Sequence, residues 1–392
     1  MLGLSDLAGR IAQSSIRSMS VECEKVGGIN LAQGVCDTEV PLLVRQGAEA
    51  AIEDGFNQYT RADGVAPLRH AIARKLQHQN GISADPETEI VVTAGVTGGI
   101  ESACRALLNA GDEVILFEPY YGYHYATLVG LHCTPKLVPL DPPNYPLVVD
   151  RLSAAVTSRT RGIIVNSPAN PSGKVFSRAE LEQTAEVAKH HDLFLFTDEI
   201  YEHFVYDGAR HISLATLPGI KERTITISGF SKVFSITGWR VGYLHAAARW
   251  TPAISYFHDL AYVCAPSALQ YGAAAGLDRL PASFYTELAA GYQHKREMIC
   301  SALRHGGLEP SVPAGAYYVL ADASSVPGKD SIQKAMNLLQ ATGVASVPGE
   351  AFFQQGRGDK LLRFCFAKKN PDLVNACERL ASLRHGSVSI GV

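Results

Sequence analysis

Short apolar runs alternate with segments of helical periodicity through the middle of the chain, and this rhythm restricts the possible fold more than any other feature. Each run ends at a glycine, a proline or an acidic residue. The runs are EIVVTAG (89–95), EVILFEP (113–119), RGIIVNSP (161–168), LFLFTDE (193–199) and RTITISG (223–229). Strands that alternate with helices pair in parallel and are covered on both faces. The pattern therefore predicts an α/β fold with a mostly parallel sheet and helices on both faces.

The last hundred residues follow a different pattern. A long helical segment begins near residue 284, and GAYYVLAD (315–322) and LLRFCFA (361–367) are typical of strands beside further helices. The first 45 residues have no strong pattern, and we expect them to pack with this α+β region. We therefore predict a large domain at about 46–278 and a small domain formed by 1–45 and 279–392.

Composition narrows the class of protein. The chain has 392 residues, a formal net charge of −3 and 46% hydrophobic residues, which is typical of a soluble protein with a sizeable core. The near-balanced charge gives no reason to expect a nucleic acid or a membrane as partner. The eight cysteines lack zinc-site spacing, so we expect no metal and reduced thiols. The N-terminus does not resemble a signal peptide, and we expect a cytoplasmic protein.

Residues that could bind a ligand follow the carboxyl ends of successive predicted strands. In an open α/β sheet, ligands bind beyond the carboxyl ends of the strands. Taken singly, each of these residues has an ordinary explanation as a turn, a helix cap or a solvated charge. The candidates are the glycine-containing turn 95–99, Asn170, Asp198, Tyr201, Lys232 and Arg240.

Together these groups match the needs of one ligand, a phosphorylated pyridinium aldehyde. Lys232 can form an imine with the aldehyde, and Asp198 can keep the ring nitrogen protonated. Asn170 and Tyr201 can bond the ring hydroxyl. The glycine turn, at a helix N-terminus, and Arg240 suit the phosphate.

Three motifs carry a resemblance to a known family. NSPANPSG (166–173) resembles N-P-x-N-P-T-G, TDEIY (197–201) resembles D-E-x-Y, and SGFSKVFSITGWRVGY (228–243) resembles S-x-S-K followed by G-W-R-x-G. The chain thereby resembles, over nearly its whole length, the class I/II aminotransferases of fold type I, which use pyridoxal 5′-phosphate (PLP). The kynurenine/glutamine transaminase and bacterial aspartate aminotransferase branches look nearest.

The resemblance implies roles for individual residues. Lys232 would carry PLP as an internal aldimine and act as catalytic base, with Asp198 and Tyr201 as the other catalytic groups. Tyr121 would stack on the cofactor ring, and Asn170 would bond the ring oxygen. The phosphate would be bound by Gly95, Val96, Thr97, Ser231 and Arg240.

Further implied contacts concern the substrate and the partner subunit. Gly34, Asn170 and Arg363 would bind the substrate carboxylate. Tyr59 would reach the phosphate across a subunit interface, which implies a homodimer with shared active sites. Cys36 departs from the family pattern, which usually has proline there, and this puts the rigidity of its loop in doubt.

The implied activity is transfer of an amino group from an L-amino acid to a 2-oxo acid, 2-oxoglutarate, by a ping-pong mechanism. We expect a neutral or aromatic donor, with aspartate as the second choice. Either Arg17 or Arg61 could bind a second carboxylate. Two alternatives stay open at this point. One is a PLP-dependent lyase, cyclase or oxidase of the same fold, and the other is a non-catalytic effector-binding module, against which the presence of Lys232 argues.

Overall fold

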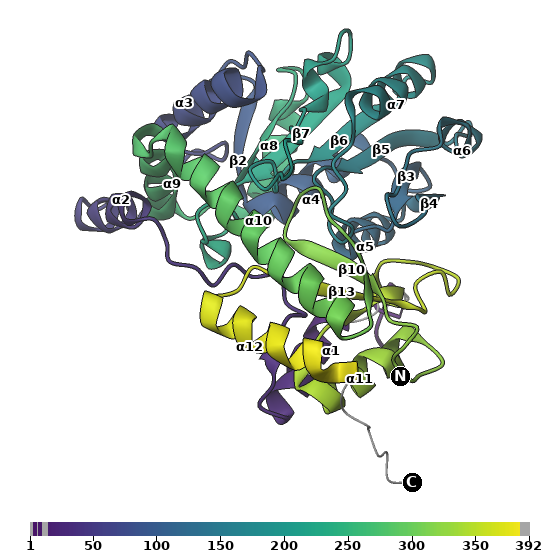
Figure 1. Ribbon diagram of the computed structural model, residues 1–392. Coiled ribbons are helices and arrows are strands. Elements are labelled where there is room, and N and C mark those ends of the chain that lie inside the picture. Colours follow the sequence, from purple (N-terminus) through teal and green to yellow (C-terminus); the bar gives the residue numbers. More distant parts are fainter. Residues whose placement is uncertain (1–2, 6, 10–14, 385–392) are drawn as a thin grey trace.

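The computed structural model describes residues 3–5, 7–9 and 15–384. A seven-stranded sheet forms the centre of its larger part (Figure 1). All neighbouring strands pair in parallel except β8, which is antiparallel to both β2 and β7. The strands, in sheet order, are β2 (Ile90–Ala94), β8 (Val241–His245), β7 (Thr224–Gly229), β6 (Phe194–Asp198), β5 (Thr160–Asn166), β3 (Glu113–Glu118) and β4 (Thr134–Pro139).

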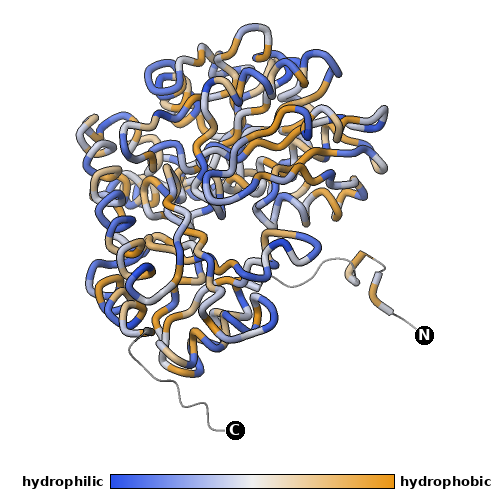
Figure 2. The backbone as a smooth tube through the Cα atoms, turned by 45° about the vertical axis from the view of Figure 1, so that its right-hand side comes forward, coloured by the Kyte–Doolittle hydropathy of each residue, from blue (hydrophilic) through white to orange (hydrophobic). Residues whose placement is uncertain are grey.

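Both faces of this sheet are buried, because successive side chains of a strand point to opposite faces. In β5, Ile163 and Val165 join one hydrophobic cluster, whereas Ile164 joins another. In the tube view the strands of this sheet are coloured mainly as hydrophobic (Figure 2). The predicted α/β class with a mostly parallel sheet is therefore confirmed. The sequence reasoning missed two of its strands, β4 and β8.

Helices surround the sheet, and α2 lies beside α9 (Figure 1). Ser177 caps helix α7 as predicted, and its side chain accepts from the backbone N–H of Glu180 in a capping box. The helices of this part are α2 (Leu42–Glu53), α3 (Ala66–Lys75), α4 (Gly95–Leu107), α5 (Gly122–Gly130), α6 (Val149–Ala154), α7 (Arg178–His190), α8 (Thr251–Tyr262) and α9 (Ser267–Arg279).

A second, antiparallel sheet has the order β12-β13-β10-β9. Its strands are β9 (Glu309–Ser311), β10 (Tyr318–Asp322), β12 (Val347–Pro348) and β13 (Leu361–Cys365). The helices of this C-terminal region are α10 (Ala282–His305), α11 (Ser331–Thr342) and α12 (Asn370–Ala381).

The N-terminal segment meets the C-terminal region. Strand β1 (Ile29–Asn30) pairs in parallel with β11 (Val344–Ala345), and α1 (Ser15–Lys25) contacts β11 and β12. We propose a division into a large domain, about 46–278, and a small domain of 1–45 and 279–392. Among the described residues, no helix has the length and apolar character needed to cross a membrane.

Candidate active site

A cavity of about 690 Å³ opens beyond the carboxyl ends of β2, β5, β6 and β7. It brings together most of the residues that the sequence singled out. Those lining it are Gly34, Val96, Thr97, Tyr121, Asn170, Asp198, Tyr201, Ser231, Lys232, Arg240 and Arg363. Gly95 lies directly behind this lining, against Arg240. Tyr59 does not reach the cavity of the single chain, and its side chain is 81% exposed.

Lys232 lies in apolar surroundings at the cavity. Its Nζ donates to the carbonyl oxygen of Gly34 over 3.1 Å and lies 5.9 Å from the ring centre of Tyr317. Burial lowers the pKa of Lys232, although the nearby thiols of Cys36 and Cys365 oppose that shift. A lowered pKa makes the neutral, nucleophilic amine more accessible near neutral pH.

The loop that contains Cys36 is fixed by contacts with the same lysine. The Cys36 side chain is buried, and its Sγ lies 3.6 Å from the backbone carbonyl oxygen of Lys232. Two residues earlier, a Cβ on Gly34 would lie 2.0 Å from the hydroxyl oxygen of Tyr318, so only glycine fits there. A thiol-to-carbonyl contact thus anchors this loop beside Lys232.

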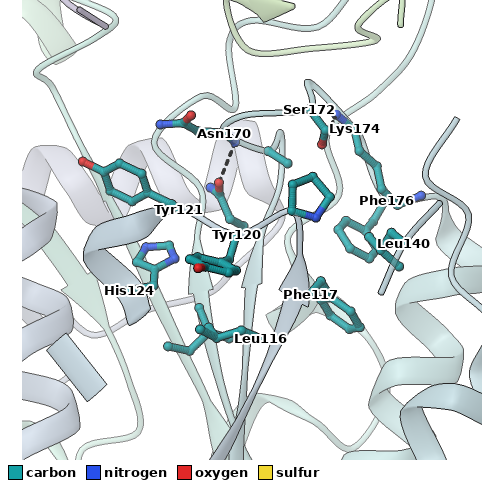
Figure 3. Close-up of a pocket in the computed structure, with 14 residues that line it drawn as sticks. Leu116, Phe117, Tyr120, Tyr121, His124, Leu140, Asn170, Ser172, Lys174 and Phe176 are labelled. Atoms are coloured by element: carbon teal, nitrogen blue, oxygen red, sulfur yellow. Dashed lines mark hydrogen bonds between the residues drawn. The ribbon is translucent and has the colours of Figure 1, made fainter. Parts of the chain in front are cut away.

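Asp198, at the end of β6, is buried and bonded from two sides. Its Oδ2 lies 3.0 Å from Nε2 of the buried His124, and its Oδ1 accepts from the backbone N–H of Ile200 over 3.2 Å. The His124 ring meets the Tyr121 ring edge-on at 5.2 Å. Figure 3 shows Tyr121 and His124 side by side below Asn170. Our sequence reasoning missed His124, because a lone histidine on a helix gives no sign of a partner 74 residues away.

Arg363 is completely buried at the cavity wall. Its Nη1 donates to Oδ1 of Asn170 over 3.0 Å, and its Nη2 donates to the carbonyl oxygen of Ala32. The guanidinium lies over the ring of Tyr318, 4.4 Å from its centre. Asn170 itself is fixed by a bond of 2.7 Å from its backbone N–H to Oδ1 of Asn166.

The hydroxyl groups of Tyr201 and Tyr318 form a hydrogen bond of 3.0 Å in the buried part of the site. Burial raises the pKa of both phenols, so they stay protonated and can donate. Tyr318 was missed from the sequence, because a tyrosine within a buried strand is usually a core residue. Only its position opposite Gly34 and Arg363 reveals its place in the site.

The sequence predicted that the glycine segment after β2 would form a turn before a helix, but the structure places this segment within the helix. Residues 95–99 form the first turns of α4 itself, so their free N–H groups lie at its N-terminus. Gly95 has φ +70°, and a Cβ there would lie 2.4 Å from Nη2 of Arg240. The backbone thus permits only glycine, and it brings a guanidinium against a helix N-terminus. This pairing fits an anion such as phosphate.

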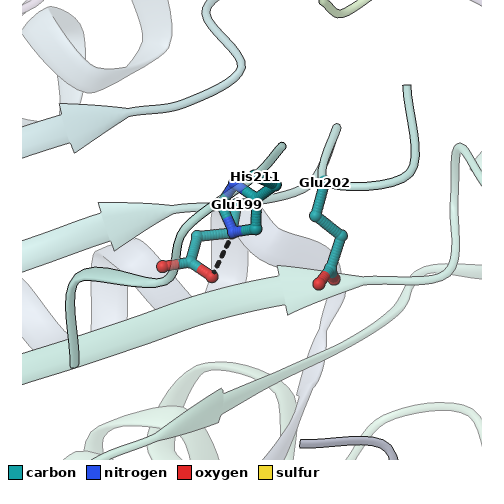
Figure 4. Close-up of side chains that lie close together, drawn as sticks. All are labelled: Glu199, Glu202 and His211. Carbon is teal, nitrogen blue, oxygen red and sulfur yellow. Dashed lines mark hydrogen bonds and ion pairs between the residues drawn. The ribbon is translucent and has the colours of Figure 1, made fainter. Parts of the chain in front are cut away.

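A second polar cluster lies behind the site and involves Glu199, Glu202 and His211 (Figure 4). Oε2 of Glu202 lies 2.5 Å from Nζ of the buried Lys75, and Oε2 of Glu199 lies 2.9 Å from Nε2 of His211. Ser213 donates to Glu199 over 2.9 Å. These carboxylates already have cationic and hydroxyl partners, so the cluster is explained as a buried ion-pair network.

Comparison with known proteins identifies the family. The family model "Aminotransferase class I and II" matches residues 26–380, so the chain belongs to the class I and II aminotransferases. The chain is a transaminase of fold type I, and the cofactor of this family is pyridoxal phosphate. This family assignment confirms the resemblance that the three sequence motifs indicated.

Three relatives illustrate the similarity. A Mycobacterium tuberculosis protein described as "Probable N-succinyldiaminopimelate aminotransferase" is 36% identical, over 95% of this chain and 96% of its own length. The solved structure of the M. tuberculosis N-succinyldiaminopimelate aminotransferase has a TM-score of 0.94 at 35% identity, covering 97% of this chain and 100% of that one. The aromatic-amino-acid aminotransferase 2 of Thermococcus litoralis is 34% identical over 97% of both chains, and the kynurenine–oxoglutarate transaminase of Dictyostelium discoideum is 33% identical over 92% of both.

Proposed function

We propose that the protein transfers the amino group of a neutral or aromatic L-amino acid to 2-oxoglutarate by a ping-pong mechanism, with Lys232 as the residue that carries PLP. The observation that carries this proposal is the convergence of Lys232, Asp198 and Arg363 on one cavity. An amine with a lowered pKa, a buried carboxylate and a buried guanidinium are the groups that such a reaction requires.

The cofactor would be held by residues from successive strand ends. Asp198 would face the ring nitrogen, Asn170 and Tyr201 would face the ring oxygen, and Tyr121 would stack on the ring. The phosphate would be bound by Gly95, Val96, Thr97, Ser231 and Arg240. The space that Gly95 leaves free beside the Arg240 guanidinium supports this assignment. When bound, PLP supplies an electron sink for the bond that breaks at the substrate Cα.

Lys232 and Asp198 have different roles in proton transfer. Nζ of Lys232 takes the Cα proton of the substrate and returns it, which requires a neutral amine. Burial favours that form by lowering the pKa of Lys232. The carboxylate of Asp198 would lie beside the ring nitrogen, and His124 orients this carboxylate through Nε2. His124 is therefore a positioning residue.

Substrate and product share one carboxylate site. Arg363 binds the α-carboxylate in a bidentate pair, with Asn170 and Gly34 beside it. The arginine is already oriented by Asn170 and Ala32, so little side-chain entropy remains to be lost on binding.

The remaining cavity wall supports the choice of donor and acceptor. Five tyrosines line the cavity, namely 121, 123, 201, 262 and 318, and the three that are not assigned to the cofactor (123, 262 and 318) suit a neutral or aromatic side chain. Arg17 also lines the cavity and is exposed, whereas Arg61 is held by Asp63 at 2.6 Å and does not line it. Arg17 is therefore our choice for the distal carboxylate of 2-oxoglutarate, or of aspartate as the alternative donor.

The working unit is a homodimer with shared active sites. Tyr59 is exposed in the single chain and would complete the phosphate site of the partner subunit. Exposed apolar side chains on α2 and α8, such as Leu42, Ile52 and Leu260, are further candidates for the subunit interface. All eight cysteines are free thiols, which supports a cytoplasmic location.

A titration of the purified enzyme with single amino acids tests the proposal. The donor should bleach the yellow absorbance of bound PLP, and 2-oxoglutarate should restore it without release of ammonia. A band that returns without an oxo acid, with ammonia released, would instead indicate elimination or oxidation. Bleaching by aspartate but not by neutral or aromatic amino acids would replace the proposed donor.

A further inference from the structure

His258, on α8, accepts a hydrogen bond from a backbone N–H at the edge of the large sheet. The donor is Ala94, the residue that precedes α4. Strand β2 is the edge strand, so its outward N–H groups have no neighbouring strand to bond. The N–H of Val92 donates to the carbonyl oxygen of Asp63 over 3.0 Å. The N–H of Ala94 donates instead to Nε2 of His258 over 2.8 Å, and that histidine is completely buried. An imidazole thus replaces a strand neighbour at this one position.

Ala94 is the residue through which the chain passes from β2 into α4. Its carbonyl oxygen lies 3.5 Å from Nη2 of Arg240, so side chains meet the residue at both its N–H and its carbonyl group. The hydroxyl of Thr93 donates to the carbonyl oxygen of Gly95 over 2.9 Å. The first turn of α4 is therefore held from its N-terminal side by a small set of fixed bonds.

The bond from Ala94 determines the charge state of His258. A backbone N–H can only donate, so Nε2 must be the unprotonated nitrogen and the ring must be neutral, with its proton on Nδ1. Burial lowers the pKa of His258, while the carboxylates of Asp259 on α8 and Glu101 on α4 oppose that shift. The Tyr262 ring lies tilted against the imidazole, with the ring centres 5.1 Å apart, and Arg105 is paired with Glu101. Residues 93 and 94 of β2 add no charge.

We infer that His258 is a positioning residue for the cofactor phosphate, because its neutral imidazole fixes Ala94 and with it the first turn of α4. The inference rests on the proposed assignment of residues 95–97 to the phosphate. A protonated His258 would place a second N–H against that of Ala94 and release the turn. Weaker binding of the phosphate should therefore accompany protonation of this one buried group.

Two substitutions separate this role from general damage. His258→Leu removes the acceptor, whereas His258→Gln keeps an uncharged acceptor of similar reach. Each enzyme, freed of cofactor, is titrated with PLP and with pyridoxal, which has the same ring and aldehyde but no phosphate. The ratio of the two dissociation constants, pyridoxal over PLP, measures the phosphate preference. This readout needs no substrate, so it is independent of the proposed donor and acceptor.

We expect His258→Leu to lower the phosphate preference about tenfold, the effect of one lost bond to a buried donor, and His258→Gln to recover most of it. His245→Leu is the matched control. It is a completely buried histidine opposite Ile90, at the far end of β2, and should leave the preference unchanged. Equal losses of PLP and pyridoxal binding in His258→Leu, or no loss of either, would overturn the inference.

The pH dependence provides a second test that does not need the leucine variant to fold. As the pH falls below about 6.5, the ordinary histidine pKa that burial lowers in His258, the phosphate preference of the wild type should fall more steeply than that of His258→Gln. Protonation of the phosphate itself affects both enzymes equally. Parallel curves for the two enzymes would contradict the role of His258.

Discussion

The carboxylate of Asp198 and the imidazole of His124 meet at 3.0 Å inside the protein, although 74 residues separate them in the sequence. Strand β6 ends at Asp198, and the first turn of α5 carries His124. Both side chains are buried, so the bond is formed in a region of low effective dielectric constant. The carboxylate is therefore oriented before any cofactor arrives.

Replacing Asp198 tests its proposed role at the ring nitrogen. We expect Asp198→Asn to retain PLP but to lower kcat by about a hundredfold or more, because the amide cannot stabilise positive charge on the ring. His124→Phe should lower kcat by about tenfold, the effect of one lost bond to a charged group. Steady-state kinetics on PLP-saturated enzymes measures both. Near wild-type turnover in Asp198→Asn would refute the electron-sink role.

Arg363 should govern the affinity for both substrates. Lysine keeps the charge but loses the planar fork, so Arg363→Lys should raise KM for donor and acceptor alike by about tenfold to a hundredfold. Initial rates with each substrate varied in turn provide the comparison. A rise for only one of the two would show that the carboxylates bind at different places.

Replacing the two candidate arginines for a second carboxylate should have different effects on KM. Arg17 lines the cavity, so Arg17→Met should raise KM for 2-oxoglutarate about three- to tenfold, a modest effect because the side chain is exposed. KM for pyruvate, which has no second carboxylate, should not change. Arg61→Met is the matched control and should alter neither value. An effect of Arg61→Met on 2-oxoglutarate alone would reverse the assignment.

The ion pair between Lys75 and Glu202 should matter for stability. Burial alone would raise the pKa of Glu202, but Lys75 together with His203 and His211 outweighs burial and holds that pKa below its usual value. Because the pKa is lower in the folded state, the contribution to stability is present above about pH 4.3 and is lost as the pH falls further.

Replacing one partner of this ion pair should lower the free energy of unfolding more than replacing both partners. Lys75→Met leaves a buried carboxylate unpaired and should lower the free energy of unfolding by about 3–5 kcal/mol, whereas the double variant Lys75→Met/Glu202→Leu should recover most of that loss. Urea denaturation at neutral pH measures both. Equal stability of the single variant and the wild type would show that the pair contributes nothing.

Local patterns allowed much of the fold to be predicted from the sequence. The five apolar runs became β2, β3, β5, β6 and β7, and Ser177 caps α7 as expected. Strand β8 was missed because VGYLH overlaps the end of the motif around Lys232 and has no turn signal of its own. Its antiparallel place between β2 and β7 depends on long-range pairing that no local pattern encodes.

The site was predicted best where a residue belongs to a motif. Lys232, Asp198 and Asn170 stand in such motifs and line the cavity together. His124 and Tyr318 stand in no motif, and their places follow only from tertiary contacts with Asp198 and with Tyr201. The choice between Arg17 and Arg61 likewise required the positions of Asp63 and of the cavity wall.

The most direct test of the account is to locate the covalent attachment of the cofactor. The purified enzyme with PLP is treated with borohydride, which fixes the cofactor to the lysine that carries it, and the protein is then digested and analysed by mass spectrometry. The account predicts loss of the yellow absorbance and a phosphopyridoxyl group on Lys232. A label on another lysine, or no yellow absorbance even with added PLP, would contradict the central claim that Lys232 carries the cofactor.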